Sequence, residues 1–225
     1  MNARMWTVIG APSSAGAHTP GVERAPAALR AAGLLDLLGR HAPVEDSGDT
    51  REFRWRPDPA YPRGQHAGAV AAVASEVAAL VATAVAGGPT PLVLGGDCTV
   101  TSGLVAGQAR AGRSPALVYV DGGPDLYTPL TRPHGNLDAT GLAHLLGLPG
   151  TLPEVAGVGP TAPLLTPDRV VVYGDSLPRG DHERELVASP RFAGLSVTEI
   201  NPDHLPDGEV LPAFVRSLAG ALAAG

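Results

Sequence analysis

The chain has 225 residues, a formal net charge of −6 and one cysteine. This length suits one sizeable core, so we expect a single domain over residues 1–225. The sixteen basic residues are scattered along an acidic chain, which argues against nucleic acid as a partner. One cysteine cannot form an internal disulfide, and the start MNARMWTVIG lacks the apolar run of a secretory signal, so we expect a cytoplasmic protein.

Short apolar runs recur along the chain in the manner of buried parallel strands. Between them lie stretches with apolar residues at three- and four-residue spacing, which is typical of helices packed on one face. The predicted strands cover 5–10, 91–96, 116–122, 170–175 and 194–200, with a weaker one at 43–48, and the predicted helices cover 23–42, 64–87, 101–112, 138–148 and 210–224. This alternation predicts an α/β fold, a three-layer αβα arrangement with a mainly parallel sheet.

The segment from Ala67 to Gly88 is long enough to raise the question of a membrane span. It consists mostly of alanine, which contributes little transfer free energy, and it contains Glu76. We therefore predict a helix packed on the sheet and no membrane partner.

In parallel α/β folds, ligands bind at the carboxyl ends of the strands, in the turns that lead to the helices. That rule selects the turns 10–21, 95–99 and 121–138, with 174–176 as a fourth. The third turn, DGGPDLYTPLTRPHGNLD, places Asp121 and Asp125 four positions apart. The first turn has glycines and serines but lacks the spacing of a phosphate-binding loop, so we expect it to line a small-molecule site.

Three segments together carry a resemblance to a known family. IGAPSSAGAHTPGVERAPAALRAAGLL opens the chain with a strand and a long loop, GGDCT follows a later strand, and VDGGPDLYTPLTRPHGNLD follows the next. In this order they resemble the opening loop, the Gly-Gly-Asp-His-Ser motif and the Asp-Ala-His-x-Asp segment of the arginase and agmatinase family, the ureohydrolases. The similarity runs from about Val8 to about Leu218 and implies an arginase-like fold.

The resemblance implies two manganese ions held by six protein ligands, of which this chain keeps few. Asp121 and Asp125 match the two aspartates of the Asp-x-His-x-Asp turn, whereas Gly123 and Cys98 stand where the family has histidines. A later Ser-x-Asp-x-Asp strand with the last two ligands is not found. Two manganese ions need many hard donors, so we expect no metal cofactor. The alternative is a single, weakly held divalent cation at Asp121 and Asp125.

The residues that would contact substrate in the family also differ. The matching positions hold Tyr127 for an asparagine, His134 for a serine and Asp138 for a catalytic histidine, while Asn136 is retained. The family's late glutamate that pairs with guanidinium is expected to lie beyond residue 225. We assign Asn136, Tyr127 and Asp97 to substrate binding, and we do not expect arginine or agmatine as the substrate.

The resemblance also bears on the order of the strands. In the family the last two strands lie between the third and the fourth, and no counterpart of them is found here. We therefore predict that strand 91–94 pairs directly with strand 116–120 in a six-stranded sheet. The alternative is a partner chain that fills the gap, and a homo-oligomer is also open.

Chemistry can remain at Asp121 and Asp125 without metal. Two nearby carboxylates repel, a raised pKa on one relieves the repulsion, and such a pair can act as general acid and general base. The alternative is that one aspartate caps a turn and the other faces water.

Other candidate catalytic residues lie close by in the sequence. Cys98 is expected at a helix N-terminus, where the dipole lowers the pKa of a thiol, so it is either a nucleophile or a packed core residue. His134 and Asp138 are either a base with its orienting acid or solvated loop residues. We expect His144 to be packed or at the surface, and His18 to border the site.

Three functions follow from these residues. The first is a divergent arginase-like enzyme that acts on a small molecule by carboxylate acid–base chemistry, through hydrolysis, lysis or cyclisation, plausibly in specialised metabolism. Its catalytic residues would be Asp121, Asp125, Asp138, His134 and Cys98. The second is a non-catalytic binding or assembly protein, and the third is a residual single-metal hydrolase of C–N bonds.

Overall fold

The computed structural model describes residues 4–121, 123–132, 134–173, 192–206 and 208–223. All predicted strands that fall in this part of the chain form. They are β1 (Trp6–Ala11), β2 (Val44–Asp49), β3 (Thr90–Gly95), β4 (Leu117–Val120), β5 (Val170–Tyr173) and β6 (Leu195–Val197). The predicted turn at 174–176 lies outside the described residues.

The strands pair in parallel, but the predicted pairing of 91–94 with 116–120 is wrong. The described strands form a four-stranded sheet in the order β2-β1-β3-β6 and a separate two-stranded sheet of β4 and β5. In the larger sheet Leu92 pairs with Leu195 and Leu94 with Val197, so the short strand β6 takes the place beside β3 that we assigned to β4. The prediction of one six-stranded sheet is therefore wrong as well.

The helices follow the predicted segments with several differences, of which the helix at 153–156 is one because no helix was predicted there. They are α1 (Ala25–Ala31), α2 (Leu34–Gly39), α3 (Ala67–Gly87), α4 (Val100–Arg110), α5 (Gly141–Leu145), α6 (Pro153–Ala156) and α8 (Val210–Ala223). The predicted helix 23–42 is broken at Gly33, whose φ of 86° is left-handed and ends α1 before α2 begins. Residues 138–140 form a 3-10 turn ahead of α5, so the predicted helix 138–148 is shorter than expected.

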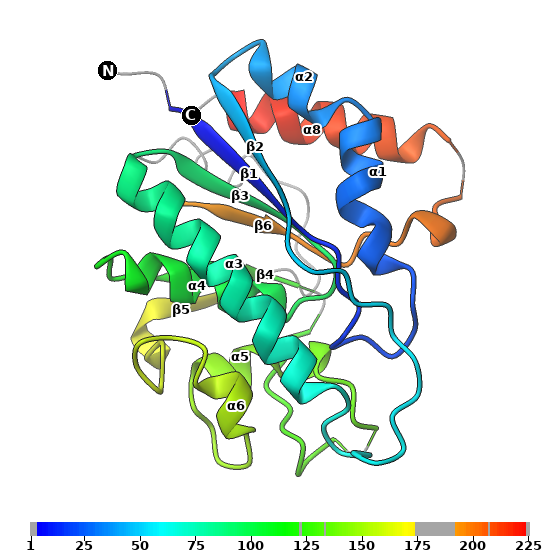
Figure 1. The fold of residues 1–225 in the computed structure, drawn as a ribbon, viewed down its shortest axis with the longest axis vertical. Helices are drawn as coiled ribbons and strands as arrows, with labels where there is room; N and C mark the ends of the chain where they lie inside the picture. The colour runs from blue at the N-terminus through cyan, green and yellow to red at the C-terminus, as the bar shows by residue number, and fades with distance from the viewer. Residues whose placement is uncertain (1–3, 122, 133, 174–191, 207, 224–225) are drawn as a thin grey trace.

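The large sheet lies between two layers of helices, as predicted (Figure 1). Side chains alternate along β1 and β3 in the way that a sheet buried on both faces requires. Trp6, Val8, Leu92 and Leu94 pack with α1, α2 and α8, whereas Ile9 and Val93 pack with α3 and α4. The three-layer αβα arrangement follows from this period-two alternation of apolar side chains.

Helix α3 is apolar and long enough to cross a membrane by length and composition alone. In the structure it packs against β1, β3 and α4 through Val73, Val77 and Val81, as predicted. The contact with α4 is close because α4 presents glycines to it. A Cβ atom at Gly103 would lie 2.6 Å from the Cβ atom of Val77, so only glycine fits there.

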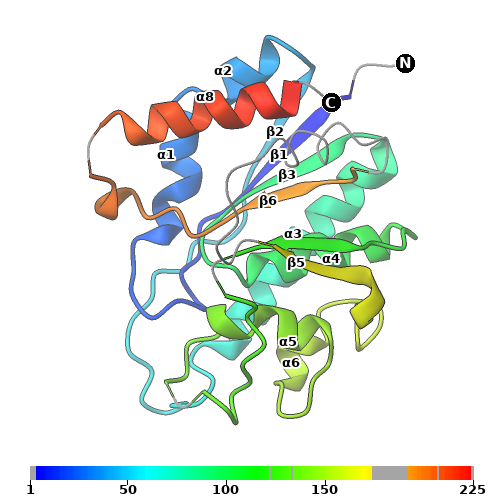
Figure 2. The same ribbon diagram turned by 180° about the vertical axis from the view of Figure 1, so that it is seen from behind.

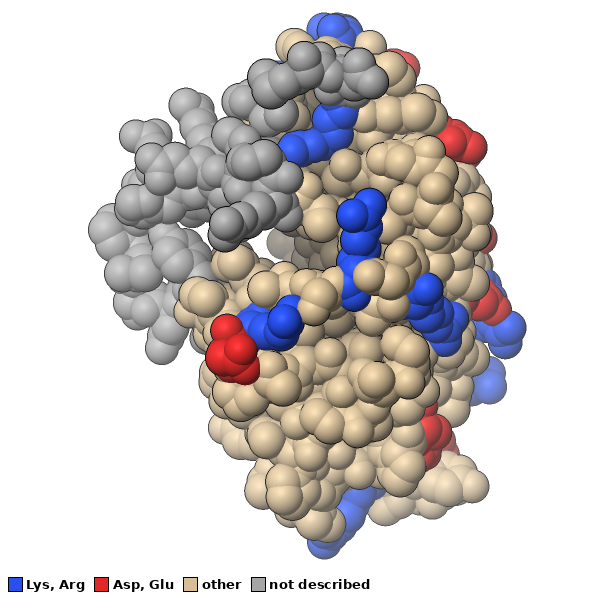
Figure 3. Space-filling model, turned by 90° about the vertical axis from the view of Figure 1, so that its left-hand side faces the viewer, with Lys and Arg blue, Asp and Glu red and all other residues tan. Residues whose placement is uncertain are grey.

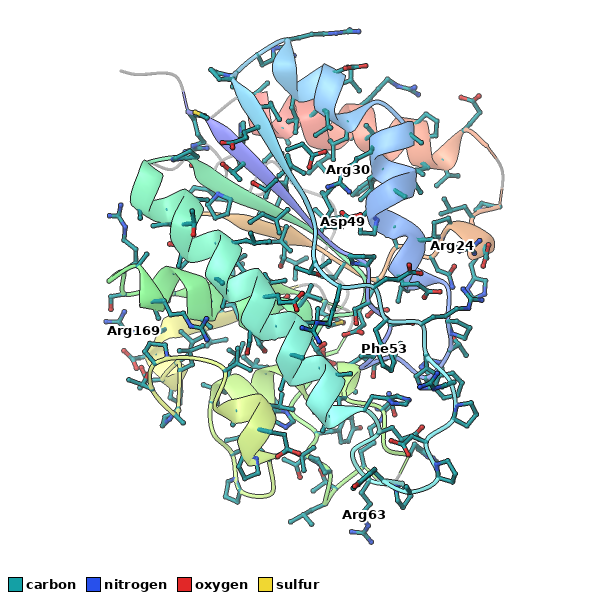
Figure 4. All side chains as sticks on the ribbon, viewed as in Figure 1. Arg24, Arg30, Asp49, Phe53, Arg63 and Arg169 are labelled. Carbon is teal, nitrogen blue, oxygen red and sulfur yellow. The ribbon has the colours of Figure 1, made fainter. Side chains whose placement is uncertain are left out.

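Charged side chains hold the surface elements in place. Figure 4 shows Arg30 of α1 beside Asp49 at the end of β2, and its guanidinium bonds both Asp49, at 2.7 Å, and Asp46, at 2.9 Å. All basic residues apart from the histidines are arginine, because the chain contains no lysine. On the face shown in Figure 3 they lie apart from one another rather than as one patch.

Candidate active site

The carboxyl ends of β3, β4 and β6 meet and bring acidic side chains around Cys98. This residue follows β3, and its thiol lies 3.3 Å from Oε1 of Glu199, which follows β6. The thiol also lies 3.7 Å from Oδ2 of Asp121, which follows β4. Asp125 completes the group, since one atom from each of Cys98, Asp121 and Asp125 lies within 4.8 Å of the others. We call Cys98, Asp121, Asp125, Asp138 and Glu199, together with the buried Asp97, the carboxyl cluster.

Asp121 and Asp125 lie together on one loop, as the sequence predicted, and Gly123 has a role between them. The backbone N–H of Gly123 donates to Oδ1 of Asp121 at 2.9 Å, which fixes that carboxylate. Asp125 is buried, has a left-handed φ of 44° and accepts a hydrogen bond from the hydroxyl of Tyr119. Burial, with the negative charge of Asp121 added, raises the pKa of Asp125 to about 6.

Glu199 is the site residue that the sequence interpretation missed. Its backbone is also left-handed, with a φ of 61°, and its Oε1 accepts a hydrogen bond of 2.9 Å from the N–H of Cys98. The residue is exposed as a whole, but burial of the carboxyl group beside Cys98, with the charge of Asp97, raises its pKa to about 7. We expected the late glutamate beyond residue 225, yet an acid at the end of a strand beside β3 is already present. The same rule that selected the other strand ends would have found it.

Of the two interpretations of Cys98, the structure favours the packed core residue over the reactive thiolate. Cys98 is 6% exposed, and burial together with the charges of Glu199, Asp125 and Asp121 raises the pKa of its thiol. The residue lies just before α4, but the helix dipole is outweighed by the carboxylates around it. A raised pKa favours the neutral thiol, and this thiol donates a hydrogen bond to Oε1 of Glu199.

Asp97 holds the first loop against the site instead of facing it. It is fully buried, and its carboxylate accepts hydrogen bonds from the N–H of Gly16 at 2.9 Å, the N–H of Thr99 at 3.0 Å and the hydroxyl of Thr99. Burial raises its pKa to about 6. These bonds use both carboxylate oxygens, so Asp97 positions the loop that we expected to line the site.

The remaining predicted residues lie along the loop after Asp125. Asp138 accepts a hydrogen bond from the amide of Asn136, and its Oδ2 lies 3.7 Å from Nδ1 of His18, which places His18 at the border as predicted. Asn136 in turn accepts from Arg132, and the Arg132 guanidinium lies 5.2 Å from the ring centre of Tyr127.

Two histidines of this region lie away from the carboxyl cluster. His134 is exposed, and Asp138 contacts Asn136 and His18 rather than forming the suggested pair with His134. His144 is buried and packed: one ring nitrogen bonds the carbonyl of Thr140 at 2.8 Å, and the other accepts from the N–H of Leu152 at 3.1 Å.

Comparison with known proteins identifies the family. A family profile described as "Arginase family" matches residues 4–207, which is most of the chain. The chain belongs to the arginase family. Arginase-1 of Mus musculus is 32% identical to it over 216 residues, which cover 95% of this chain and 66% of that protein. Arginase-1 of Homo sapiens is 32% identical over 225 residues, which cover 98% of this chain and 69% of that protein.

The fold of this arginase-family chain agrees with that of solved arginases. The structure of the arginase from Bacillus caldovelox matches with a TM-score of 0.81 at 21% identity, over 99% of both chains. The chain spans about two thirds of the length of the curated relatives that it matches.

Arginase-family proteins normally bind manganese, and the candidate ligands that lie close together here are fewer than a two-manganese centre needs. Cys98, Asp121 and Asp125 are the one group of candidate ligands that lies close together within the described residues. Two hard Mn²⁺ ions need more oxygen and nitrogen donors than these, and Gly123 offers no side chain between the aspartates. The three donors of this group suit a single ion.

Proposed function

We propose that this arginase-family chain acts on a small molecule without a two-manganese centre, by proton transfer between carboxyl groups. The observation that carries the proposal is the pair Asp125 and Glu199, whose pKa values are raised to about 6 and about 7. Ordinary carboxyl groups are fully ionised at neutral pH, whereas these two titrate close to it. Groups of this kind are suited to accept and release protons during a reaction.

The two groups have different roles at neutral pH. Asp125 is mostly ionised and can accept a proton, and the Tyr119 hydroxyl fixes its Oδ2. Glu199 is about half protonated and can donate one, and the Cys98 N–H fixes its Oε1. The carboxylate of Asp121 adds negative charge beside Asp125. This arrangement suits hydrolysis, lysis or cyclisation of a small molecule, and we place the protein in the cytoplasm and in specialised metabolism.

The backbone supports a constrained site. Asp125 and Glu199 both have left-handed φ angles, which are unfavourable for residues with a Cβ atom and are found preferentially at functional positions.

A second candidate function is a single-metal hydrolase. It is favoured by the short mutual distances of Cys98, Asp121 and Asp125, whose donors suit one ion that accepts both sulfur and oxygen. A third candidate, a non-catalytic binding protein, shares the same site residues and differs in having no turnover.

Metal analysis separates the first two candidates. The protein is loaded with excess Mn²⁺ or Zn²⁺, desalted and analysed for bound metal, with Asp121→Asn as the control. We expect no stoichiometric metal and no urea release from arginine or agmatine. Two manganese ions per chain would refute the proposal, and one zinc ion lost in Asp121→Asn would establish the second candidate.

Metabolite profiling tests turnover without a known substrate. A small-molecule extract is incubated with the wild-type protein, with Asp125→Asn, with Glu199→Gln and with Glu52→Gln, which changes an exposed acid away from the site. We expect the same metabolites to be consumed by the wild-type protein and by Glu52→Gln, and to persist with the two site variants. Consumption that survives Asp125→Asn contradicts the acid–base role, and no consumption by any of the four favours the binding protein.

A further inference from the structure

The two parallel sheets end at the same cluster, but no ladder joins them. Strand β6 bonds β3 through one edge, and β4 bonds β5 through one edge. The opposite edges of β6 and β4 have no strand partner in the part of the chain that the structure describes. Figures 1 and 2 both show β6 and β4 as neighbouring strands with their tips at the same end. We call these two unbonded strand edges the open edges.

Beside the open edge of β4 lies an exposed aliphatic face. The parallel register places Val118 opposite Val171, so the two side chains share a face, and they are 39% and 58% exposed. Val120, two residues further on, lies on the same face and is 62% exposed. The other face of the pair is partly covered, because Leu117 and Val170 pack with α5, while Val172 on that face is 44% exposed. A β-branched strand whose edge is unbonded and whose face is exposed, as here among the described residues, is a template for strand addition.

The cluster at the strand tips has an uncompensated negative charge. Asp121 and Glu199 each place a carboxylate oxygen within 3.7 Å of the Cys98 thiol, and Asp125 lies beside them. Within the described residues, the basic side chain in ion-pair contact with these acids is His18, which is 73% exposed at the border. A segment whose end enters this cluster therefore gains most by carrying a positive charge there.

We propose that the open edges of β6 and β4 form a docking site for one extended segment of a partner polypeptide. The segment runs parallel to both strands, is aliphatic and β-branched over about the four residues of β4, and carries an arginine or lysine at its carboxyl end. Its backbone bonds both open edges, and its basic residue enters the carboxyl cluster. The partner thereby joins the two sheets into one.

A second copy of this chain is a poorer occupant than another polypeptide. The six strands of the described residues are already bonded in ladders, so a copy would have to break one of them to donate a strand. The docking site goes beyond the proposed chemistry and does not depend on it. Peptide binding and metabolite turnover are separate measurements, so either proposal can fail alone.

Synthetic peptides with hydrogen exchange test the proposal. The probes are acetyl-Thr-Val-Ile-Val-Arg-amide, the same peptide ending in glutamate, and the arginine peptide with N-methylated backbone. In the free protein we expect fast exchange at 117–120 and 195–197, which the arginine peptide slows. The glutamate peptide should bind at least about tenfold more weakly, because like charges meet at the cluster. The N-methylated peptide should not protect, because it cannot bond the edges.

Each other outcome overturns the proposal. Slow exchange of both strands in the free protein means that the edges are already occupied. Peptide-induced protection at 44–49 means that β2 is the docking edge. Equal binding of the arginine and glutamate peptides means that the carboxyl cluster does not select a basic residue. A concentration-dependent dimer whose strands 117–120 and 195–197 are protected assigns the site to a second copy. In a Val120→Asp variant with wild-type circular dichroism, the arginine peptide should no longer slow exchange at 117–120 and 195–197. If the peptide still slows exchange there, the proposal is wrong.

Discussion

Replacing Asp125 with asparagine is expected to stabilise the protein at pH 8. Burial, with the charges of Asp121 and Asp138 added, raises the pKa of Asp125 from 3.8 to about 6 in the folded state. At about 1.4 kcal/mol per pKa unit, ionised Asp125 destabilises the fold by ~3 kcal/mol relative to the unfolded chain. Asparagine has the same shape without the charge, and its Oδ1 can still accept the hydrogen bond from Tyr119.

The pH dependence fixes the sign of the effect. Below about pH 4 the group is protonated in both states and carries no penalty, and above about pH 6 it is ionised in both and carries the full penalty. The Asp125 contribution to the free energy of unfolding is therefore present at low pH and lost as pH rises through 6. The asparagine variant lacks this contribution to the pH dependence.

Urea unfolding at pH 5 and pH 8 measures the difference. At pH 8 we expect Asp125→Asn to be more stable than the wild type by about 1–3 kcal/mol, which is a rise of about 3–10 °C in melting temperature for a chain of this size. The gain should be smaller at pH 5. Glu52→Gln, at an exposed site, should behave like the wild type at both values. An Asp125→Asn variant less stable than the wild type at pH 8, or with the wild-type pH slope, refutes the reasoning.

Three further predictions concern single residues. Cys98 should resist iodoacetamide at pH 8 in the native protein and react in urea, because its thiol is buried and its pKa is raised. Mass spectrometry measures the labelling, and rapid labelling of the native protein would contradict the prediction. His144→Ala should lower the free energy of unfolding by about 2–4 kcal/mol, since it removes a packed ring and two hydrogen bonds, whereas His134→Ala should change it by less than ~0.5 kcal/mol. Gly103→Ala should lower the free energy of unfolding by about 1–3 kcal/mol, because the added Cβ overpacks the contact with α3. Gly68→Ala should be neutral or stabilising, because a Cβ there meets nothing within 4 Å. Equal effects of the two changes in denaturant unfolding would contradict this prediction.

The elements of this fold could be predicted from local patterns, but the sheet order could not. Apolar runs mark strands such as 91–96 and 116–122 because burial on both faces leaves a continuous apolar signature. Which strands become neighbours depends on packing between distant segments. The three-residue strand β6 pairs with β3, and nothing in its own residues distinguishes a central position from an edge. The break at Gly33 was readable in principle, since glycine between two apolar stretches is a helix-ending signal.

Part of the site could be predicted from the sequence, whereas the rest is formed by residues that are distant in the sequence and close only in the fold. Asp121 and Asp125 are four positions apart, so their proximity is local. Glu199 lies about a hundred positions from Cys98, and the two are brought together by the pairing of β6 with β3. The two interpretations of the Cys98 thiol stayed open for the same reason, because the helix N-terminus is visible in the sequence whereas the surrounding carboxylates are not.

The left-handed backbones of Asp125 and Glu199 have an evolutionary consequence. Glycine at either position would relax the main chain by about 1 kcal/mol and remove a repelled negative charge at the same time. A lineage that no longer used these acids would gain stability from such a change and meet no selection against it. Glycines at 125 and 199 in related sequences would therefore mark the lineages in which this cluster has fallen out of use.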